Sequence, residues 1–170
     1  MEKSEKTPLK RDKTLVPLSR EHHFGLLFCW KLRQGLKNGA DLQQMRAYVR
    51  YFWDNILHEH CQEEEWLLRR LLVVNDTLRI RIEEEHRLLE AIIRLICDGE
   101  HLQSRLFDTL QQDLNDHIRW EERTLFPYLQ TVADPEELQL AGKLLAKRHT
   151  SHTDDFAPEF WVNPVPETKP

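Results

Sequence analysis

The sequence predicts an all-α protein: an up-down-up-down four-helix bundle with an additional short C-terminal helix. No proline occurs between Leu18 and Phe126, and apolar residues in this region recur at helical rather than alternating spacing. The breaks between the periodic segments are short and lie at 38–40, 75–76 and 98–100. Short connections place consecutive helices antiparallel, which is the ordinary route to such a bundle.

Start and stop signals define five helices. Ser19 supplies an N-cap for the first helix, which ends before Asn38-Gly39. Asp41, through its relation to Gln44, resembles a capping box for the second helix, and Asp134-Pro135 begins the fifth. The helices are expected at about 19–37, 41–75, 77–98, 101–130 and 135–148.

Pro127 lies within the last turn of the fourth predicted helix. Proline has no backbone N–H, so it removes the hydrogen bond to Arg123, and we expect it to kink that turn.

The length of 170 residues and the 40% apolar content indicate a single domain with a core of its own. Residues 1–17 are expected to form an extended arm, 18–150 the helical domain, and 151–170 an irregular tail. Phe160 and Trp161 in this tail are expected to lie over the bundle. The arm is basic, with Lys3, Lys6, Lys10, Arg11 and Lys13.

Charge and composition argue against several classes of partner. The net charge is −5 and no basic stripe is present, which argues against nucleic acid. No apolar run reaches about 18 residues and the first 17 residues are charged, so we expect a cytoplasmic protein that does not insert into membranes. Cys29, Cys61 and Cys97 are odd in number and form no CxxC pair, which favours reduced thiols.

One motif occurs twice. It combines a His and a Glu four residues apart with leucines on either side, and the second copy follows the first by 57 positions. The first copy consists of Leu57, His60, Glu64, Leu68 and Leu72, and the second of Leu114, His117, Glu121, Leu125 and Leu129. A His and a Glu four residues apart lie on one helical face, about 6 Å apart along the axis and about 40° around it. Each pair lies within an apolar stripe, where imidazole and carboxylate groups are costly unless they are paired or coordinated. Two such faces opposed across a bundle could hold metal between them.

Two other predicted helices each present a histidine in a matching frame. Leu18, His22, Cys29 and Leu32 parallel Ile82, His86, Ile93 and Ile96. His23 is the alternative on the first helix, but it shares its stripe with polar residues, so we favour His22. The order along the chain is therefore H, HxxxE, H, HxxxE.

Acidic residues surround these positions. Each of the four histidines follows an acid: Glu21, Glu59, Glu85 and Asp116. These acids are either solvated flanks or acceptors from a ligand on a neighbouring helix. Glu63, Glu65 and Glu122 are expected on a solvated face, although one could accept a hydrogen bond from a ligand imidazole. Glu90 either pairs with Arg94 on the surface, which we favour, or approaches an open metal position.

The remaining histidines are assigned no metal role. His58 is expected on a polar flank of its helix, and His101, His149 and His152 fall near loops or in the tail region.

This pattern resembles the hemerythrin-like (HHE cation-binding) domain family, whose motif is a His on helix one, HxxxE on helix two, a His on helix three and HxxxE on helix four. The corresponding segments here are SREHHFGLL, ILHEHCQEEEWLL, EEEHRLLEAI and LNDHIRWEERTLFPYLQ. The resemblance implies His22, His60, His86 and His117 as terminal ligands, with Glu64 and Glu121 bridging two non-haem iron ions. It also implies an oxo or hydroxo bridge between the irons.

Two departures separate the chain from the oxygen-carrying members of this family. Those members have a second His four residues after the helix-three His, where this chain has Glu90, and an Asp five after the helix-four His, where it has Glu122. The chain is more similar to six-ligand members, which include iron-centre repair proteins with an extra cysteine-containing N-terminal domain that this sequence does not show.

We therefore expect a di-iron protein that binds or reacts with O2, NO or peroxide in sensing, scavenging or stress response. One alternative is an enzyme of iron-centre repair or peroxide decomposition. A second is a metal-free helical interaction module whose histidines only satisfy buried hydrogen bonds.

Overall fold

The computed structural model describes residues 10–148 and 151–163, and within these ranges every regular element is helical. The all-α prediction is therefore confirmed for the described residues. The elements are α1 (Val16–Lys37), α2 (Leu42–Phe52), the π-helical turn η1 (Trp53–Leu57), α3 (His58–Leu71), α4 (Thr77–Asp98), α5 (Ser104–Trp120), the π-helical turn η2 (Glu121–Leu125), α6 (Phe126–Val132) and α7 (Pro135–Arg148).

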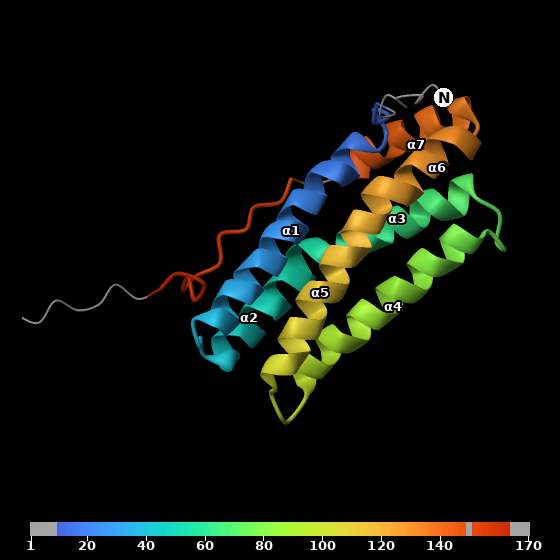
Figure 1. The fold of residues 1–170 in the computed structure, drawn as a ribbon. Coiled ribbons are helices and arrows are strands. Elements are labelled where there is room, and N and C mark those ends of the chain that lie inside the picture. Colours follow the sequence, from blue (N-terminus) through green and yellow to red (C-terminus); the bar gives the residue numbers. More distant parts are fainter. Residues whose placement is uncertain (1–9, 149–150, 164–170) are drawn as a thin grey trace, which may run out of the picture.

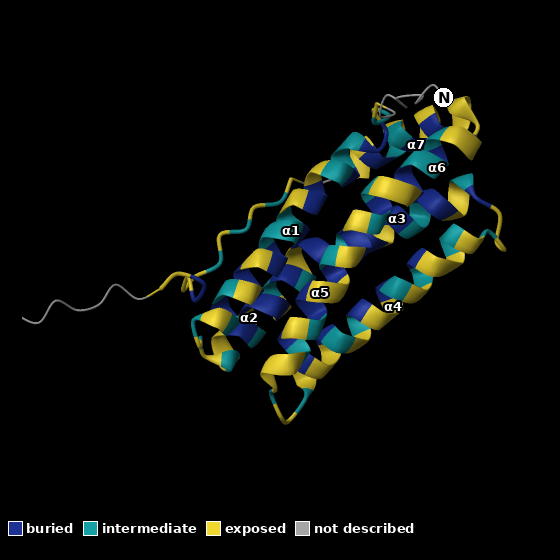
Figure 2. Ribbon diagram, in the orientation of Figure 1, coloured by how far each residue is buried: buried dark blue, intermediate teal, exposed yellow. Residues whose placement is uncertain are grey.

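These elements form four long helical rods that lie side by side, with α7 at one end (Figure 1). The rods are α1, then α2–η1–α3, then α4, and finally α5–η2–α6. α1 packs most extensively on α5, and α4 contacts α2, α3 and α5. Figure 2 shows buried residues on the faces that the rods turn toward one another and exposed residues on their outer faces.

The first helix begins earlier than the sequence predicted. α1 starts at Val16 with Pro17 in its first turn, and Leu15 occupies the N-cap position without a side-chain hydrogen bond. Proline is favoured in a first helical turn because the missing N–H has no partner there in any case. The N-cap role assigned to Ser19 is thus wrong, and its hydroxyl donates instead to Glu122 on η2.

Three of the other helices begin after an aspartate whose side chain accepts from amides of the first turn. Asp41 accepts from the Gln43 amide, Asp76 from Leu78 and Arg79, and Asp134 from Glu136 and Glu137. α3 ends at Leu71, earlier than expected, because the chain is extended at Leu72. α5 begins at Ser104 rather than near His101.

Two rods contain a π-helical turn where the sequence suggested continuous α-helix. η1 directly precedes the α-helix that carries His60, and η2 begins at Glu121. The interruption near Pro127 therefore falls before the proline, which lies in the first turn of α6. π-Helical turns are frequent at functional sites, because one extra residue re-aims the side chains around it.

The core consists of two apolar clusters, one toward each end of the bundle. The first is formed around Phe28, Phe52, Leu89 and Ile118, and the second around Leu18, Leu67, Ile82 and Leu125. Every rod passes through both clusters, and its predicted ligands lie between them: His22 between Leu18 and Phe28, for example, and His86 between Ile82 and Leu89. The apolar clusters thus enclose a polar layer in the middle of the bundle.

The C-terminal segment (residues 151–163) packs on this bundle as predicted. Phe160 and Trp161 are buried in the first cluster and lie against Tyr48 of α2. The predicted basic residues Lys3 and Lys6, His149, and residues 164–170 of the tail lie outside the described residues. Of the described helices, none combines the length and apolar character needed to cross a membrane.

Candidate metal centre

All six residues predicted as ligands meet in the polar layer. α1 contributes His22, α3 contributes His60 and Glu64, α4 contributes His86, and α5 with η2 contributes His117 and Glu121. None is more than 6% exposed, and the Glu121 side chain is completely buried. The four separate segments of the motif therefore converge on one buried site.

The six side chains form two groups that share a carboxylate. Glu64, His86, His117 and Glu121 have potential ligand atoms that all lie within 4.8 Å of one another, and so do His22, His60 and Glu64. We refer to the two halves of the site as the His22–His60 half and the His86–His117 half.

Both carboxylates extend across the two halves. Glu64 directs Oε1 toward His60 Nε2 at 3.0 Å and Oε2 toward His86 Nε2 at 3.4 Å. Glu121 directs Oε1 toward His117 Nε2 at 3.0 Å and Oε2 toward His22 Nε2 at 3.1 Å. Each half therefore faces two imidazole nitrogens and one oxygen from each carboxylate.

Several of these buried atoms make no hydrogen bond among the described residues, although each lies within 3.4 Å of the ion-pair partner named above. They are Glu64 Oε2, His86 Nε2, Glu121 Oε1 and Glu121 Oε2. A buried polar atom without a partner costs free energy, so native structures rarely leave several together. Imidazole nitrogens and carboxylate oxygens suit iron and other divalent transition metals. The donor set therefore fits metal ions bound between the two halves.

The outer nitrogen of each imidazole is held by a carboxylate from a neighbouring rod. Nδ1 of His22 lies 2.7 Å from Glu122, that of His60 2.8 Å from Glu21, that of His86 3.1 Å from Glu65, and that of His117 2.7 Å from Glu85. A carboxylate only accepts, so Nδ1 carries the proton and donates it. This fixes each ring with its Nε2 toward Glu64 and Glu121.

These four supporting carboxylates close a ring around the bundle. The α1 rod supports the imidazole on α3, α3 supports that on α4, α4 supports that on α5, and η2 on the α5 rod supports that on α1. Each supporting acid is adjacent in sequence to a predicted ligand on its own rod. Neighbouring helical positions differ by about 100°, so one residue faces the centre while the next faces the adjoining rod.

The imidazoles hold protons in the metal-free site. Burial alone lowers the pKa of His60, but the Glu64 and Glu21 carboxylates outweigh it and raise the pKa to about 10. Burial also lowers the pKa of His117, but the carboxylates of Glu121 and Glu85 have the larger effect and raise this pKa to about 9. Against the effect of burial, Glu121, Glu122 and Glu64 raise the pKa of His22. Cys61, followed by Glu64 and Glu65, likewise raises the pKa of His86. Metal must therefore displace protons from Nε2.

The carboxylates stay ionised under the same conditions. Burial raises the pKa of Glu64, yet the imidazoles of His60, His22 and His86 bring it well below the ordinary value. At Glu122 burial is again outweighed, chiefly by the hydrogen bond from His22, and the pKa falls to about 2. The site thus keeps its anionic oxygens available over the whole neutral range.

The structure distinguishes the alternatives that the sequence left open. His22 is buried in the centre, whereas His23 is exposed. Glu90 accepts from Arg94 on the surface, as favoured. His58 is exposed, as predicted for a polar flank.

The acidic residues follow a mixed pattern. Of the acids that precede the histidines, Glu21 and Glu85 support an imidazole of a neighbouring rod, but Glu59 and Asp116 do not supply the other two. Glu65 and Glu122, expected on a solvated face, supply them instead. The expectation is wrong for Glu63 as well, because this residue is only 9% exposed.

An internal cavity of about 10 Å³ adjoins the centre on the side of the first apolar cluster. His22, His60 and Glu121 form its polar wall, and Ile56 and Ile118 belong to its apolar wall. α1 approaches α5 closely here, since a Cβ atom on Gly25 would lie 2.6 Å from Ile118 Cδ1. A cavity of this size accommodates about one water-sized molecule.

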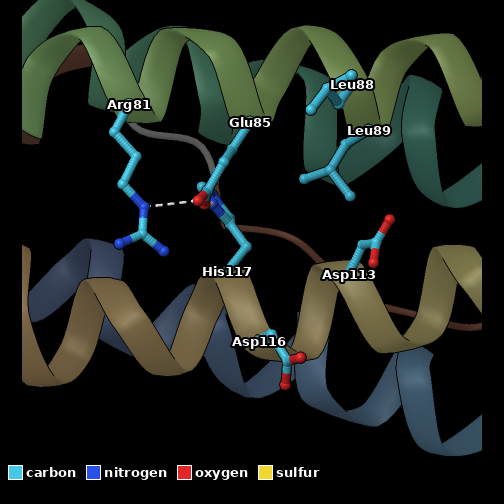
Figure 3. Close-up of a pocket in the computed structure, with 7 residues that line it drawn as sticks. All are labelled: Arg81, Glu85, Leu88, Leu89, Asp113, Asp116 and His117. Carbon is cyan, nitrogen blue, oxygen red and sulfur yellow. Dashed lines mark hydrogen bonds and ion pairs between the residues drawn. The ribbon is translucent and has the colours of Figure 1, made fainter.

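A larger cleft of about 270 Å³ opens between α4 and α5 (Figure 3). Figure 3 shows the Glu85 carboxylate beside the His117 ring, with Leu88 and Leu89 on the α4 side. Arg81 donates to Glu85 at 2.6 Å at one end of this cleft. The cleft therefore brings solvent close to the outer edge of one predicted ligand.

Fold and site together define an all-helical protein with a buried histidine–carboxylate centre that could hold metal ions. The model of the hemerythrin HHE cation binding domain matches residues 77–156, slightly less than half of the chain. This match confirms, over residues 77–156, the resemblance indicated by the motifs. The matched segment contains His86, His117 and Glu121. No curated protein and no solved structure matches the chain.

Proposed function

We propose that this protein is a hemerythrin-like non-haem di-iron protein built as an up-down-up-down four-helix bundle. In this proposal His22 and His60 would hold one iron, His86 and His117 would hold the other, and Glu64 and Glu121 would be shared by both. The observation that carries the proposal is the orientation of the two carboxylates, each of which directs one oxygen toward each half of the site.

The bridging role follows from elementary electrostatics. Two cations held close together repel each other, and a carboxylate between them reduces that repulsion. Glu64 and Glu121 are completely or almost completely buried, so solvent screens their charges little. The supporting carboxylates fix the four rings before any metal arrives, which lowers the cost of ordering them on binding.

We further propose a small diatomic molecule or peroxide as the physiological ligand. Four protein donors in each half leave coordination positions open, because iron in such sites commonly takes five or six donors. When bound, two iron ions would supply the redox chemistry and the open positions that O2, NO or peroxide require. The chain's own contribution is the small, largely apolar cavity beside His22 and Glu121, which admits small molecules and limits water.

The sequence argues against a role as an oxygen carrier, because one position differs from the carriers that this chain resembles. At the position where those carriers have an additional histidine, this chain has a different residue. That residue is Glu90, which is engaged with Arg94 on the surface. With fewer protein donors, more positions stay open, and we expect O2 or peroxide to oxidise the reduced protein instead of binding reversibly. We propose sensing, scavenging or stress response as the corresponding role.

Metal analysis and rapid mixing test this proposal. Anaerobic reconstitution should give two irons per chain, and the reduced protein should change its absorption spectrum on mixing with O2, NO or peroxide. Sparging the O2-treated protein with argon should not restore the reduced spectrum. Complete restoration would reject the exclusion of a carrier role, and a folded protein that retains less than about half a metal per chain would reject the di-iron assignment. Catalytic peroxide turnover would favour the enzyme alternative.

A further inference from the structure

The two halves of the centre are supported by different parts of the chain. In the His86–His117 half, the supporting acids Glu65 and Glu85 pair with arginines on their own helices: Arg69 at 2.6 Å and Arg81 at 2.6 Å. In the His22–His60 half, Glu122 accepts from Ser19 of α1, but the basic partners of the supporting acids come from outside the four rods. Arg11 of the N-terminal segment (residues 10–15) contacts Glu122, and His152 of the C-terminal segment contacts Glu21.

Arg11 holds Glu122 by both its side chain and its backbone. Nη2 donates to the Glu122 carboxylate at 2.7 Å and to the Glu122 carbonyl at 2.8 Å. In this π-helical turn the amide of Phe126 donates to the carbonyl of Glu121, five residues earlier. By the same spacing, the carbonyl of Glu122 would need to accept from the amide of residue 127. That residue is Pro127, which has no N–H. Arg11 therefore satisfies a carbonyl that the helix itself cannot.

The N-terminal segment is anchored beside this contact. Leu15 is fully buried in the second apolar cluster, and Thr14 donates to the Leu138 carbonyl of α7 at 3.0 Å. The Arg11 guanidinium also lies 5.1 Å from the centre of the Phe126 ring, which itself stacks on His22. The position of Glu122 thus depends on a segment that reaches the centre from one end of the bundle.

His152 reaches the other supporting acid of the same half. Its Nε2 lies 3.4 Å from Glu21 and 3.5 Å from Glu59, and its side chain is only 10% exposed. Asp154, two residues on, accepts from Lys31 at 2.9 Å and from the Tyr48 hydroxyl at 2.5 Å. Lys31 in turn lies 4.0 Å from the centre of the Trp161 ring.

The C-terminal segment therefore runs beside α1, and Asp154, two residues after His152, fastens it to both α1 and α2 (Figure 1). Because Glu21 holds the Nδ1 atom of His60, an interaction that orders the segment also orders a ring of the centre.

We propose that the His22–His60 half is a second metal position controlled by docking of the two terminal segments, with Arg11 and His152 as its positioning residues. This inference rests on the proposed two-metal function. The His86–His117 half would fill first, because four donors already lie within 4.8 Å of one another there, against three in the other half. It also receives its support from within the rods themselves.

The exposure of the contacts agrees with this difference. Arg69 and Arg81 are 55% and 48% exposed, and exposed ion pairs within one helix contribute little. Arg11 and His152 are 22% and 10% exposed, so loss of either contact removes a better-shielded interaction. By linkage, metal in the His22–His60 half must favour the docked segments as strongly as the docked segments favour that metal.

Stepwise titration of Fe2+ into the metal-free 170-residue chain, under anaerobic conditions with a competing chromophoric chelator, tests this proposal. Wild type should show two binding steps. Arg11→Ala or His152→Ala should weaken the second step by about 10-fold, as substitutions behind metal ligands commonly do, and leave the first within about twofold. The matched control Arg94→Ala, which removes an exposed pair with Glu90 outside the centre, should change neither step by more than about twofold. His152→Gln, which keeps a donor for Glu21, should recover most of the loss.

Two further backgrounds identify the half that is affected. His86→Ala leaves the His22–His60 half intact, so adding His152→Ala should weaken the remaining iron by about 10-fold. His22→Ala disables that half, so adding His152→Ala should have no effect. Hydrogen exchange tests the docking of the C-terminal segment without any substitution at His152 or Arg11. In the His86→Ala protein, Fe2+ should protect the backbone amides of residues 151–163 from exchange. In the His22→Ala protein, Fe2+ should give these amides no protection.

The proposal is overturned if the Arg11 and His152 variants bind both irons as wild type does, or weaken both steps equally. It is also overturned if the effect of His152→Ala persists in the His22→Ala background. A wild-type protein that binds no iron rejects the di-iron function and this inference together. A wild type with two irons and insensitive variants rejects the inference alone.

Discussion

Replacing Glu64 by glutamine tests whether one carboxylate serves both metal positions. The amide keeps the volume of this buried side chain, but it removes the charge and leaves only one oxygen where two now face the two halves. We expect Glu64→Gln to weaken both irons. His86→Ala removes a nitrogen that faces only one half and should chiefly weaken one iron.

The magnitude follows from linkage between binding and folding. Each occupied position adds about 2.7 kcal/mol to the free energy of unfolding when the free metal is at about 100 times its Kd. Two positions therefore add about 5.4 kcal/mol, and about 2–4 °C per kcal/mol in a chain of this size gives a metal-induced rise in Tm of about 11–22 °C. His86→Ala should keep roughly half of that rise, and Glu64→Gln little of it.

The assay compares the Tm of each variant with and without Fe2+, so that any effect of the substitution on the metal-free fold cancels. His58→Ala is the matched control, because His58 is exposed on the same helix and lies outside the centre. A Glu64→Gln protein with the full wild-type rise would refute the bridging role. Equal losses in Glu64→Gln and His86→Ala would refute the distinction between bridging and terminal ligands.

Three other predictions follow from the site. His22→Ala should lower iron occupancy and His23→Ala should leave it nearly unchanged in metal analysis, since only His22 faces Glu64 and Glu121; the reverse would place the wrong ring in the centre. In the unfolded chain the pKa of histidine is about 6.5, whereas in the fold it is about 10 for His60 and about 9 for His117. The protonated imidazoles therefore stabilise the metal-free fold fully below pH ~6.5. This stabilisation is lost as the pH rises toward 10. The Tm of the metal-free protein should therefore fall over pH 7–10. Calorimetry in buffers of different ionisation enthalpy should detect about four protons released on metal binding near pH 7, one from each imidazole whose pKa is raised; a rising Tm or no proton release would contradict these pKa shifts. Ile118→Ala should enlarge the internal cavity and speed the reaction with O2 in stopped-flow absorption by several-fold, and an unchanged rate would show that this cavity is not the route of the small ligand.

The six residues of the candidate centre could be predicted because their chemistry and their helical spacing coincide. A His and a Glu four residues apart share a face, so the stripe that buries Leu57 and Leu68 also points His60 and Glu64 inward. The same reasoning selected His22 over His23, since only one phase of that helix is apolar. The structure brings all of these predicted residues into one buried layer.

The supporting groups were only partly predictable. Acids next to ligands look like solvated flanks in a sequence, and whether Glu59 or Glu21 meets an imidazole depends on which rods are neighbours. The π-helical turns depend on packing that no local propensity expresses. His152 could not be found, because its role arises from the return of the C-terminal segment beside α1.

Iron quantification combined with Mössbauer spectroscopy of the anaerobically reconstituted, then oxidised protein tests the central claim most directly. The account predicts two irons per chain that are magnetically coupled, because Glu64 and Glu121 each face both halves of the centre. A folded protein that retains one isolated iron, or less than about half a metal per chain, would contradict it.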